Sequence, residues 1–189
     1  MGYLRLASQT NALDDRDHFL EVAGHLSYRR ASQANLCVLS EIVKDQRVLA
    51  LLDPLKGRGP NLARAEVAWN DYRWSPSANG KKIALLSDSD PGHIQILDTE
   101  GGRKSAIGLK GWQVQSTSWS PDNQHLYVSG GFGSGFRVAS VDLNGKVKSL
   151  LDVPMGQGWP ADPQPSPDGH YLGYVLRLFE ANVVMLENH

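Results

Sequence analysis

The tripeptide Trp119-Ser120-Pro121 decides the fold of this chain because it belongs to a series of three. Trp74-Ser75-Pro76 precedes it and Pro165-Ser166-Pro167 follows it, so that the serines lie 45 and 46 residues apart. A constant period of this size is typical of repeat proteins. Proline after a small polar residue suits a tight turn, and residues of strand type follow each copy. Each repeat is therefore predicted to contain a strand, a tight turn and a second strand.

A second marker with the same period is an aspartate or asparagine at the end of an apolar run. These residues are Asp53, Asp98, Asp142 and Asn188, with spacings of 45, 44 and 46. They extend the series back to a unit whose Ser-Pro has been lost near residues 30–32. We therefore predict four units, which span residues 24–68, 69–111, 112–158 and 159–189.

The third unit has the clearest strand pattern. Its four predicted strands are Gln113–Trp119, His125–Ser129, Phe136–Val141 and Val147–Leu151. The dipeptide Asn144-Gly145 between the last two is a strong hairpin signal. Four short antiparallel strands at a period near 45 match the blade of a β-propeller. A two-sheet sandwich is the alternative, but it does not explain the period. The predicted fold is an all-β propeller of about four units, either partial or small.

Residues 1–23 have a weaker pattern and are predicted to be a poorly defined segment before the repeats. Tyr3–Leu6 alternates enough for a short strand, whereas Asn11–Glu21 could form a loop or a short helix. In the first repeat, the apolar runs Leu36–Ile42 and Arg47–Leu52 predict a hairpin.

Composition argues against several classes of partner. The net charge of −1 over 189 residues gives neither a broad basic surface for nucleic acid nor an acidic tail. The single cysteine, Cys37, excludes an internal disulfide. The first 25 residues lack a signal-peptide pattern, and no stretch is long and apolar enough for a bilayer. We therefore expect no nucleic acid and no membrane as partner, and a cytoplasmic location, or a periplasmic one if the chain is a fragment.

No pattern in the sequence predicts a metal, a cofactor or a catalytic residue. Asp88 and Asp90 resemble the opening of a calcium loop, but the later ligands and the glycine at its required place are missing. The glycine-rich residues 130–135 precede a strand rather than a helix, which favours a hairpin loop over a phosphate-binding loop. We expect no cofactor, no metal and no enzymatic activity.

Three tryptophans recur where the outer strand of one unit leads into the inner strand of the next. This position lies at the mouth of the channel in a propeller, and polar residues follow each indole. The predicted ligand-binding or partner-binding residues are Trp69, Asp71, Arg73, Trp112, Gln113, Gln115, Trp159, Asp162 and Gln164. Concave openings with aromatic and polar side chains are where ligands and peptides tend to bind. The alternative interpretation is that the indoles only fill the gaps between blades.

The turn tripeptide and the strand after it resemble the repeat of TolB-like bacterial propellers and of propeller domains in prolyl-oligopeptidase-type peptidases. Residues 166–175 and 182–188 also look like the closing blade of propellers attached to bacterial Ser/Thr kinases and winged-helix regulators. The resemblance covers about residues 30–189 and implies a sensing or interaction module rather than an activity. The chain departs from the pattern at Ser77–Gly80, where the turn is predicted to be two residues longer, and at Pro165, which replaces tryptophan.

Propellers of this type usually have more than four blades, and the last unit ends after its predicted third strand. Residues 1–23 could supply the missing outer strand and close a four-bladed ring. Alternatively, the chain is the C-terminal part of a larger propeller, truncated or completed by a second copy, and we favour this alternative. The predicted function is a non-catalytic module that binds a protein, peptide or small ligand. The alternative is the propeller of a peptidase-type or lyase-type enzyme whose catalytic part lies elsewhere.

Overall fold

The chain folds as a series of antiparallel sheets. The computed structural model describes residues 2–6, 18–22, 26–34, 36–44, 46–53, 55–66 and 73–178. These residues form strands and no helix, so they contain no helical segment long and apolar enough to cross a membrane. The expected third strand of the last unit, at 182–188, lies outside the described residues, as do Trp69 and Asp71.

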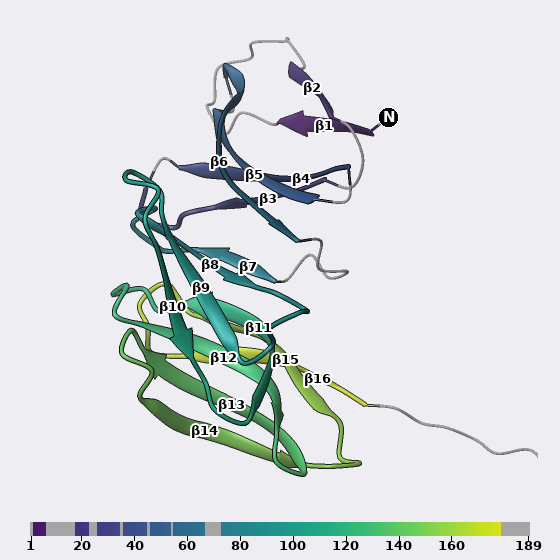
Figure 1. The fold of residues 1–189 in the computed structure, drawn as a ribbon, viewed down its shortest axis with the longest axis vertical. Coiled ribbons are helices and arrows are strands. Elements are labelled where there is room, and N and C mark those ends of the chain that lie inside the picture. Colours follow the sequence, from purple (N-terminus) through teal and green to yellow (C-terminus); the bar gives the residue numbers. More distant parts are fainter. Residues whose placement is uncertain are drawn as a thin grey trace, which may run out of the picture.

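Three sheets of four sequential strands repeat along the chain, and we call them blades 1 to 3 (Figure 1). Blade 1 contains β3 (Leu26–Arg30), β4 (Cys37–Val43), β5 (Gln46–Asp53) and β6 (Gly57–Glu66). Blade 2 contains β7 (Trp74–Pro76), β8 (Lys82–Leu86), β9 (His93–Asp98) and β10 (Lys104–Gly108). Blade 3 contains β11 (Trp112–Trp119), β12 (His125–Phe132), β13 (Gly135–Asp142) and β14 (Val147–Pro154). Blade 4 is described only as the hairpin of β15 (Trp159–Pro165) and β16 (Leu172–Arg177). The predicted all-β fold of four-stranded blades is confirmed.

The first strand of each blade is its inner strand. Consecutive inner strands contact each other, β3 with β7, β7 with β11, and β11 with β15. The sheets follow one another from the N-terminal hairpin to blade 3, and blade 4 lies behind blade 3 in the view of Figure 1. This is the arrangement of propeller blades around a common axis.

The hydrophobic core lies between the blades because both faces of a blade are apolar. Along β8, Ile83 and Leu85 pack with residues of blade 1, whereas Ala84 and Leu86 pack with residues of blade 3. Alternate side chains of a strand point to opposite faces, so one strand serves two interfaces. Each fully buried leucine or isoleucine stabilises the fold by about 1.5–3 kcal/mol. Blade 2 is therefore held from both sides.

The turn after the inner strand is the same structure in every blade. In three blades a serine N–H donates to the carbonyl five residues later, and the serine hydroxyl accepts from the backbone N–H of that same later residue. These serines are Ser77, Ser120 and Ser166. In blade 1 the backbone bond alone is present, from Ala31 N to Leu36 O. The turn thus recurs in all four units, with its serine replaced by alanine in the first.

The predicted register of blade 2 is wrong by two residues. The equivalent of Ser120 is Ser77, not Ser75, and Asn79 occupies the place of Asp122. The turn at Ser77–Gly80 therefore has the same length as the others. The tripeptide match was misleading because it aligned Trp74 with Trp119, whereas the turn aligns Pro76 with Trp119.

The second marker of the repeat has a structural cause. The Oδ1 atoms of Asp53, Asp98 and Asp142 each accept hydrogen bonds from two backbone N–H groups in the turn that follows. A short side chain that bonds its own turn in this way favours the start of a tight loop. These bonds lower the pKa of the Asp53 and Asp98 carboxyls from the ordinary value of 3.8.

The N-terminal residues contain more strand than predicted. The short strand at Tyr3–Leu6 is confirmed as part of β1 (Gly2–Leu6), but the loop or helix over Asn11–Glu21 is wrong where the structure describes it. There, β2 (His18–Val22) pairs antiparallel with β1. Among the described residues these two strands pair only with each other, and the strand of blade 4 beside which an outer strand would lie, at 182–188, is outside the described residues.

Candidate functional site: a cavity among the inner strands

A cavity of about 240 Å³ lies where the inner strands of blades 2, 3 and 4 come together, and we call it the inner-strand cavity. Its lining residues are Arg73, Gln115, Ser116, Trp159, Ala161, Asp162 and Arg177. Arg73 comes directly before β7, and the others belong to β11, β15 and β16. Three units distant in sequence thus contribute to one hollow.

Two β-bulges shape the lining. The pairing of β11 with β12 skips Gln115, and the pairing of β15 with β16 is interrupted between Ala161 and Gln164. A bulge inserts an extra residue, bends the strand and changes the direction of its side chain. Gln115 and Asp162 are the cavity-lining residues at these two bulges.

The backbone at Asp162 is strained and is held by the neighbouring blade. Asp162 has a φ of 51°, in the left-handed region that residues other than glycine seldom adopt, although aspartate and asparagine do so more often than most. Such a residue costs on the order of 1–3 kcal/mol and persists only where its surroundings fix it. Its N–H donates to Ser116 Oγ at 3.0 Å, and Ser118 Oγ donates to the Pro163 carbonyl at 2.6 Å. Blade 3 therefore stabilises the bulge of blade 4.

Two arginines give the cavity its charge, and each is paired with an aspartate. Arg177 Nη2 lies 3.2 Å from Asp162 Oδ2, and Arg73 Nη1 lies 2.6 Å from Asp88 Oδ1. The side chains of Arg73 and Asp162 are 16% and 15% exposed, and that of Arg177 is 40% exposed. Asp88 is outside the lining, so the wall itself holds two guanidinium groups and one carboxylate.

The structure brings four of the nine predicted residues to this cavity, namely Arg73, Gln115, Trp159 and Asp162. Gln113 and Gln164 are exposed and are not part of the lining, and Trp69 and Asp71 lie outside the described residues. Whether these residues bind a ligand stays a prediction.

Trp112 has different surroundings from Trp159. It belongs to the core between blades 2 and 3, and its ring lies 5.3 Å from that of Phe132. The alternative interpretation, an indole that fills the gap between blades, describes its packing. Trp112 also lines a second, more open hollow of about 490 Å³, together with Asp90, His93 and Lys110. Trp159 is half-buried, lines the inner-strand cavity and lies 6.3 Å from the ring of Phe136.

Sequence reasoning missed Ser116, Ala161 and Arg177. Ser116 and Ala161 carry no signal, because serine and alanine are ordinary in inner strands. A signal for Arg177 was available, because pairing the predicted strands of the last unit as a hairpin places Arg177 opposite Trp159. Extending the predicted strand after Val175 by two residues would have found it.

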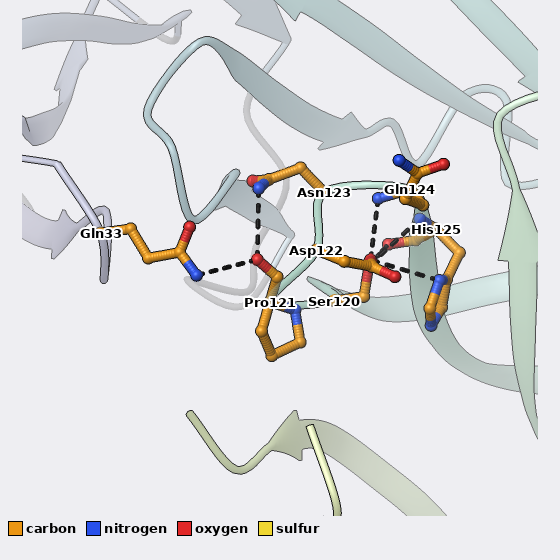
Figure 2. Close-up of polar contacts among 7 residues, drawn as sticks. All are labelled: Gln33, Ser120, Pro121, Asp122, Asn123, Gln124 and His125. Carbon is orange, nitrogen blue, oxygen red and sulfur yellow. Dashed lines mark hydrogen bonds and ion pairs between the residues drawn. The ribbon is translucent and has the colours of Figure 1, made fainter. Parts of the chain in front are cut away.

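A serine, an aspartate and a histidine lie together in the blade 3 turn, but they do not form a catalytic arrangement. Figure 2 shows Ser120 Oγ donating to Asp122 Oδ1 at 2.5 Å, while His125 Nδ1 lies 3.6 Å from the same carboxylate oxygen. The Ser120 residue is buried and its hydroxyl bonds the carboxylate and the turn backbone. A nucleophilic serine needs the histidine as its hydrogen-bonding base. Within the described ranges, no three His, Cys, Asp or Glu side chains gather closely enough to hold a metal ion.

The turns at the other end of the inner strands are linked across blades. Gln33 Nε2 of blade 1 donates to the Pro121 carbonyl of blade 3 at 3.0 Å (Figure 2), and Asn79 N donates to Asn123 Oδ1. These polar bonds tie three turns together at the end opposite the start of the inner strands.

Sequential four-stranded antiparallel blades with adjoining inner strands define the fold of the chain as a β-propeller. Its fold is similar to that of an Agrobacterium tumefaciens protein described as TolB, with a TM-score of 0.65 and 18% identity over 80% of this chain and 53% of that one. TolB of Acinetobacter baumannii has a TM-score of 0.61 and 18% identity, over 78% of this chain and 36% of that one. The Cps50 (Swd1) propeller domain of Myceliophteria thermophila has a TM-score of 0.57 and 13% identity, over 80% of this chain and 49% of that one. The chain thus spans about half the length of these structures, or less.

Sequence comparison gives a shorter match. The chain is 34% identical over 67 residues to YuxL of Bacillus subtilis, which is described as an uncharacterized peptidase. The match covers 34% of this chain and 10% of that protein. No protein-family model matches the chain.

Proposed function

We propose that the chain is a non-catalytic binding module whose inner-strand cavity holds part of a protein, a peptide or a small ligand. The observation that carries this proposal is the convergence of three inner strands on one hollow with a strained, cross-blade-supported aspartate in its wall. Strained backbone tends to cluster at functional sites. The volume of about 240 Å³ lies just below the roughly 300–1,000 Å³ of pockets for drug-sized ligands, which suits one side chain or end group.

The test is a screen of small fragments of mixed charge by ligand-observed NMR. The double variant Gln115→Ala/Trp159→Ala removes two walls of the cavity, and Gln113→Ala/Gln164→Ala is the matched control with two exposed side chains on the same strands. We expect fragments that bind the native chain and the control, and lose at least about tenfold in affinity on the cavity variant. Fragments that bind all three proteins equally, or none at all, contradict the proposal.

A second candidate is the propeller of a peptidase-type or lyase-type enzyme with its catalytic part elsewhere. The match to the B. subtilis protein described as a peptidase favours it. This chain alone should then neither hydrolyse a dipeptide nitroanilide nor cleave a uronate polysaccharide. Turnover of these substrates would require fusion to a catalytic domain. Turnover by the chain that the Gln115→Ala/Trp159→Ala variant abolishes would overturn the non-catalytic proposal.

The mass in solution tests the ring-completing second copy predicted from the number of repeats. Blade 4 exposes Tyr174, Val175 and Leu176 on β16, so an apolar sheet surface is accessible to a partner. Light scattering that shows a dimer supports completion by a second copy, and a monomer at all concentrations contradicts it.

A further inference from the structure

We infer that the inner-strand cavity binds an oxyanion, a carboxylate or a phosphate, attached to a flat or apolar group. This inference rests on the proposed function and specifies the chemistry of its ligand. It follows from the guanidinium donors in the wall, from the burial of the Arg73 side chain and from the position of Trp159.

The wall of the cavity offers more donors than acceptors. Each guanidinium carries five N–H donors and no acceptor. Asp162, the carboxylate of the lining, already accepts from Arg177, and Ser116 Oγ already bonds Asp162 N and Ser129 Oγ. Among the described residues each arginine makes one close contact with a carboxylate, Arg73 with Asp88 and Arg177 with Asp162, which leaves donors on both guanidinium groups for a ligand. A ligand that completes this wall must bring acceptors.

Burial makes an oxyanion the best acceptor for these donors. The Arg73 side chain is only 16% exposed and its partner Asp88 approaches from outside the cavity lining. Guanidinium groups bind carboxylates and phosphates through two parallel hydrogen bonds, which are stronger than neutral ones. Asp88 balances the charge of Arg73 as Asp162 balances that of Arg177, so the preference for an oxyanion rests on the guanidinium N–H donors in the lining and not on a net charge.

Trp159 and Ala161 form the apolar part of the wall, beside the polar Gln115 and Ser116. Trp159 is half-buried on one side, and the Ala161 side chain is buried beside Asp162. An indole with a small neighbour provides apolar surface for a ring or an aliphatic chain next to the charged group. Asp162 limits the affinity, because its carboxylate competes with the ligand for Arg177.

Four probes with one ring and different head groups test the inference on the native chain. They are benzoate, phenyl phosphate, benzamide and benzylamine, titrated separately by ligand-observed NMR. We expect benzoate, phenyl phosphate or both to bind at least about tenfold tighter than benzamide, as charge-assisted hydrogen bonds imply, and benzylamine to bind most weakly. Comparing the affinities of benzoate and phenyl phosphate decides whether the cavity prefers a carboxylate or a phosphate.

Variants separate an anion site from a general loss of structure. Arg177→Gln should weaken the anionic probes about tenfold, and Arg137→Gln, which breaks a surface pair with Asp152, should not. Asp162→Asn should strengthen anion binding several-fold, because asparagine tolerates the left-handed φ and competes for Arg177 only as a neutral acceptor. Arg73→Gln should also weaken binding of the anionic probes, and it is used as a test only if its thermal unfolding curve matches that of the native chain.

The outcomes distinguish this inference from the proposed function. If benzamide or benzylamine binds as tightly as the anions and the Gln115→Ala/Trp159→Ala variant abolishes that binding, the oxyanion inference fails and the binding function stands. Weaker anion binding by Asp162→Asn also overturns the inference. If none of the four probes binds, the inference fails, and the proposed function fails with it where the fragment screen finds nothing in the cavity.

Discussion

Blades 3 and 4 begin with the same hairpin but bury it differently. In β12, Leu126 and Val128 are fully buried. At the equivalent positions 46 residues later, Leu172 is half-buried and Tyr174 is 45% exposed. The serine turn that joins the two strands has the same hydrogen bonds in both blades.

The difference shows which properties of a blade are local. The turn and the strand pairing are encoded within one unit, because they recur with the same bonds in blades 2, 3 and 4. Burial comes from neighbours, since β12 has β13 beside it and blade 2 on one face, whereas the described partner of β16 is β15 alone. Stability is therefore expected to be concentrated in blades 2 and 3 and to decline toward blade 4.

Two leucine substitutions, one in each hairpin but not at equivalent positions, should give the largest contrast between the two blades. Leu126→Ala opens a cavity in the core between blades 2 and 3, and should lower the free energy of unfolding by about 2–5 kcal/mol. Leu176→Ala on β16 starts from a residue that is 44% exposed and should cost less than about 1 kcal/mol. Urea unfolding measures both values. Equal losses would mean that blade 4 is covered in solution as fully as blade 3.

Two glycines in the equivalent hairpins should give the next largest contrast. A Cβ at Gly130 would lie 2.1 Å from the Gln113 carbonyl oxygen, because the bulge at Gln115 brings β11 close. Gly130→Ala should therefore displace the β11 backbone and cost about 1–3 kcal/mol or more. A Cβ at Gly173 would meet only the Gln164 carbonyl, at 3.8 Å, so Gly173→Ala should be near neutral. Thermal unfolding of both variants is the measurement, and a neutral Gly130→Ala would contradict the bulge geometry of blade 3.

Two serines of blade 2 test the corrected register. Ser77 Oγ bonds both Asn79 Oδ1 and Lys82 N, as Ser120 does with its own turn. Ser77→Ala should cost about 1–2 kcal/mol, as Ser120→Ala should, because a buried polar bond network is lost. Ser75 Oγ makes only a 3.5 Å contact with the Pro76 carbonyl, so Ser75→Ala should cost less than about 0.5 kcal/mol. The opposite order would restore the register that the tripeptide predicted.

These cases explain how much of the fold the sequence could predict. The repeat number, the four-stranded unit and the strands of blade 3 follow from the period and from alternating apolar residues. The register of blade 2 could not be predicted in this way, because Trp74-Ser75-Pro76 repeats the tripeptide two residues before the position of the turn. What defines the turn is the backbone bond from an N–H to the carbonyl five residues later, made at Ser77 in blade 2. Ala78 in the place of proline hid that equivalence.

The candidate site could be predicted only in part for a related reason. Period analysis located the inner strands, so Arg73, Gln115, Trp159 and Asp162 were found. It could not separate Gln115 from Gln113, because the bulge that decides which side chain lines the cavity depends on pairing with β12. The left-handed backbone at Asp162 depends in the same way on two serines of another blade.

The smallest expected effect is on the stability of the fold at low pH. It is tested by comparing Asp122 and Asp168, the carboxylates at equivalent places in the turns of blades 3 and 4. Burial raises the pKa of Asp122, but hydrogen bonds from Ser120 and from the turn backbone outweigh it, so that the pKa lies below 3.8. The Ser166 hydroxyl and a backbone N–H likewise lower the pKa of Asp168. A carboxylate with a lowered pKa in the folded state stabilises the fold above its unfolded pKa. That stabilisation is lost as the pH falls through the folded pKa.

Both carboxyls should therefore titrate below pH 3.8 in an NMR titration of the folded chain. Asp122→Asn and Asp168→Asn should each reduce the loss of stability below about pH 4, because the amide oxygen still accepts the turn hydrogen bonds but has no proton to gain. An ordinary pKa for Asp168 beside a lowered one for Asp122 would mean that the blade 4 turn opens in solution. The hairpin would then need its neighbours for its turn as well as for its burial, and the distinction between local and neighbour-supplied properties would fail at blade 4.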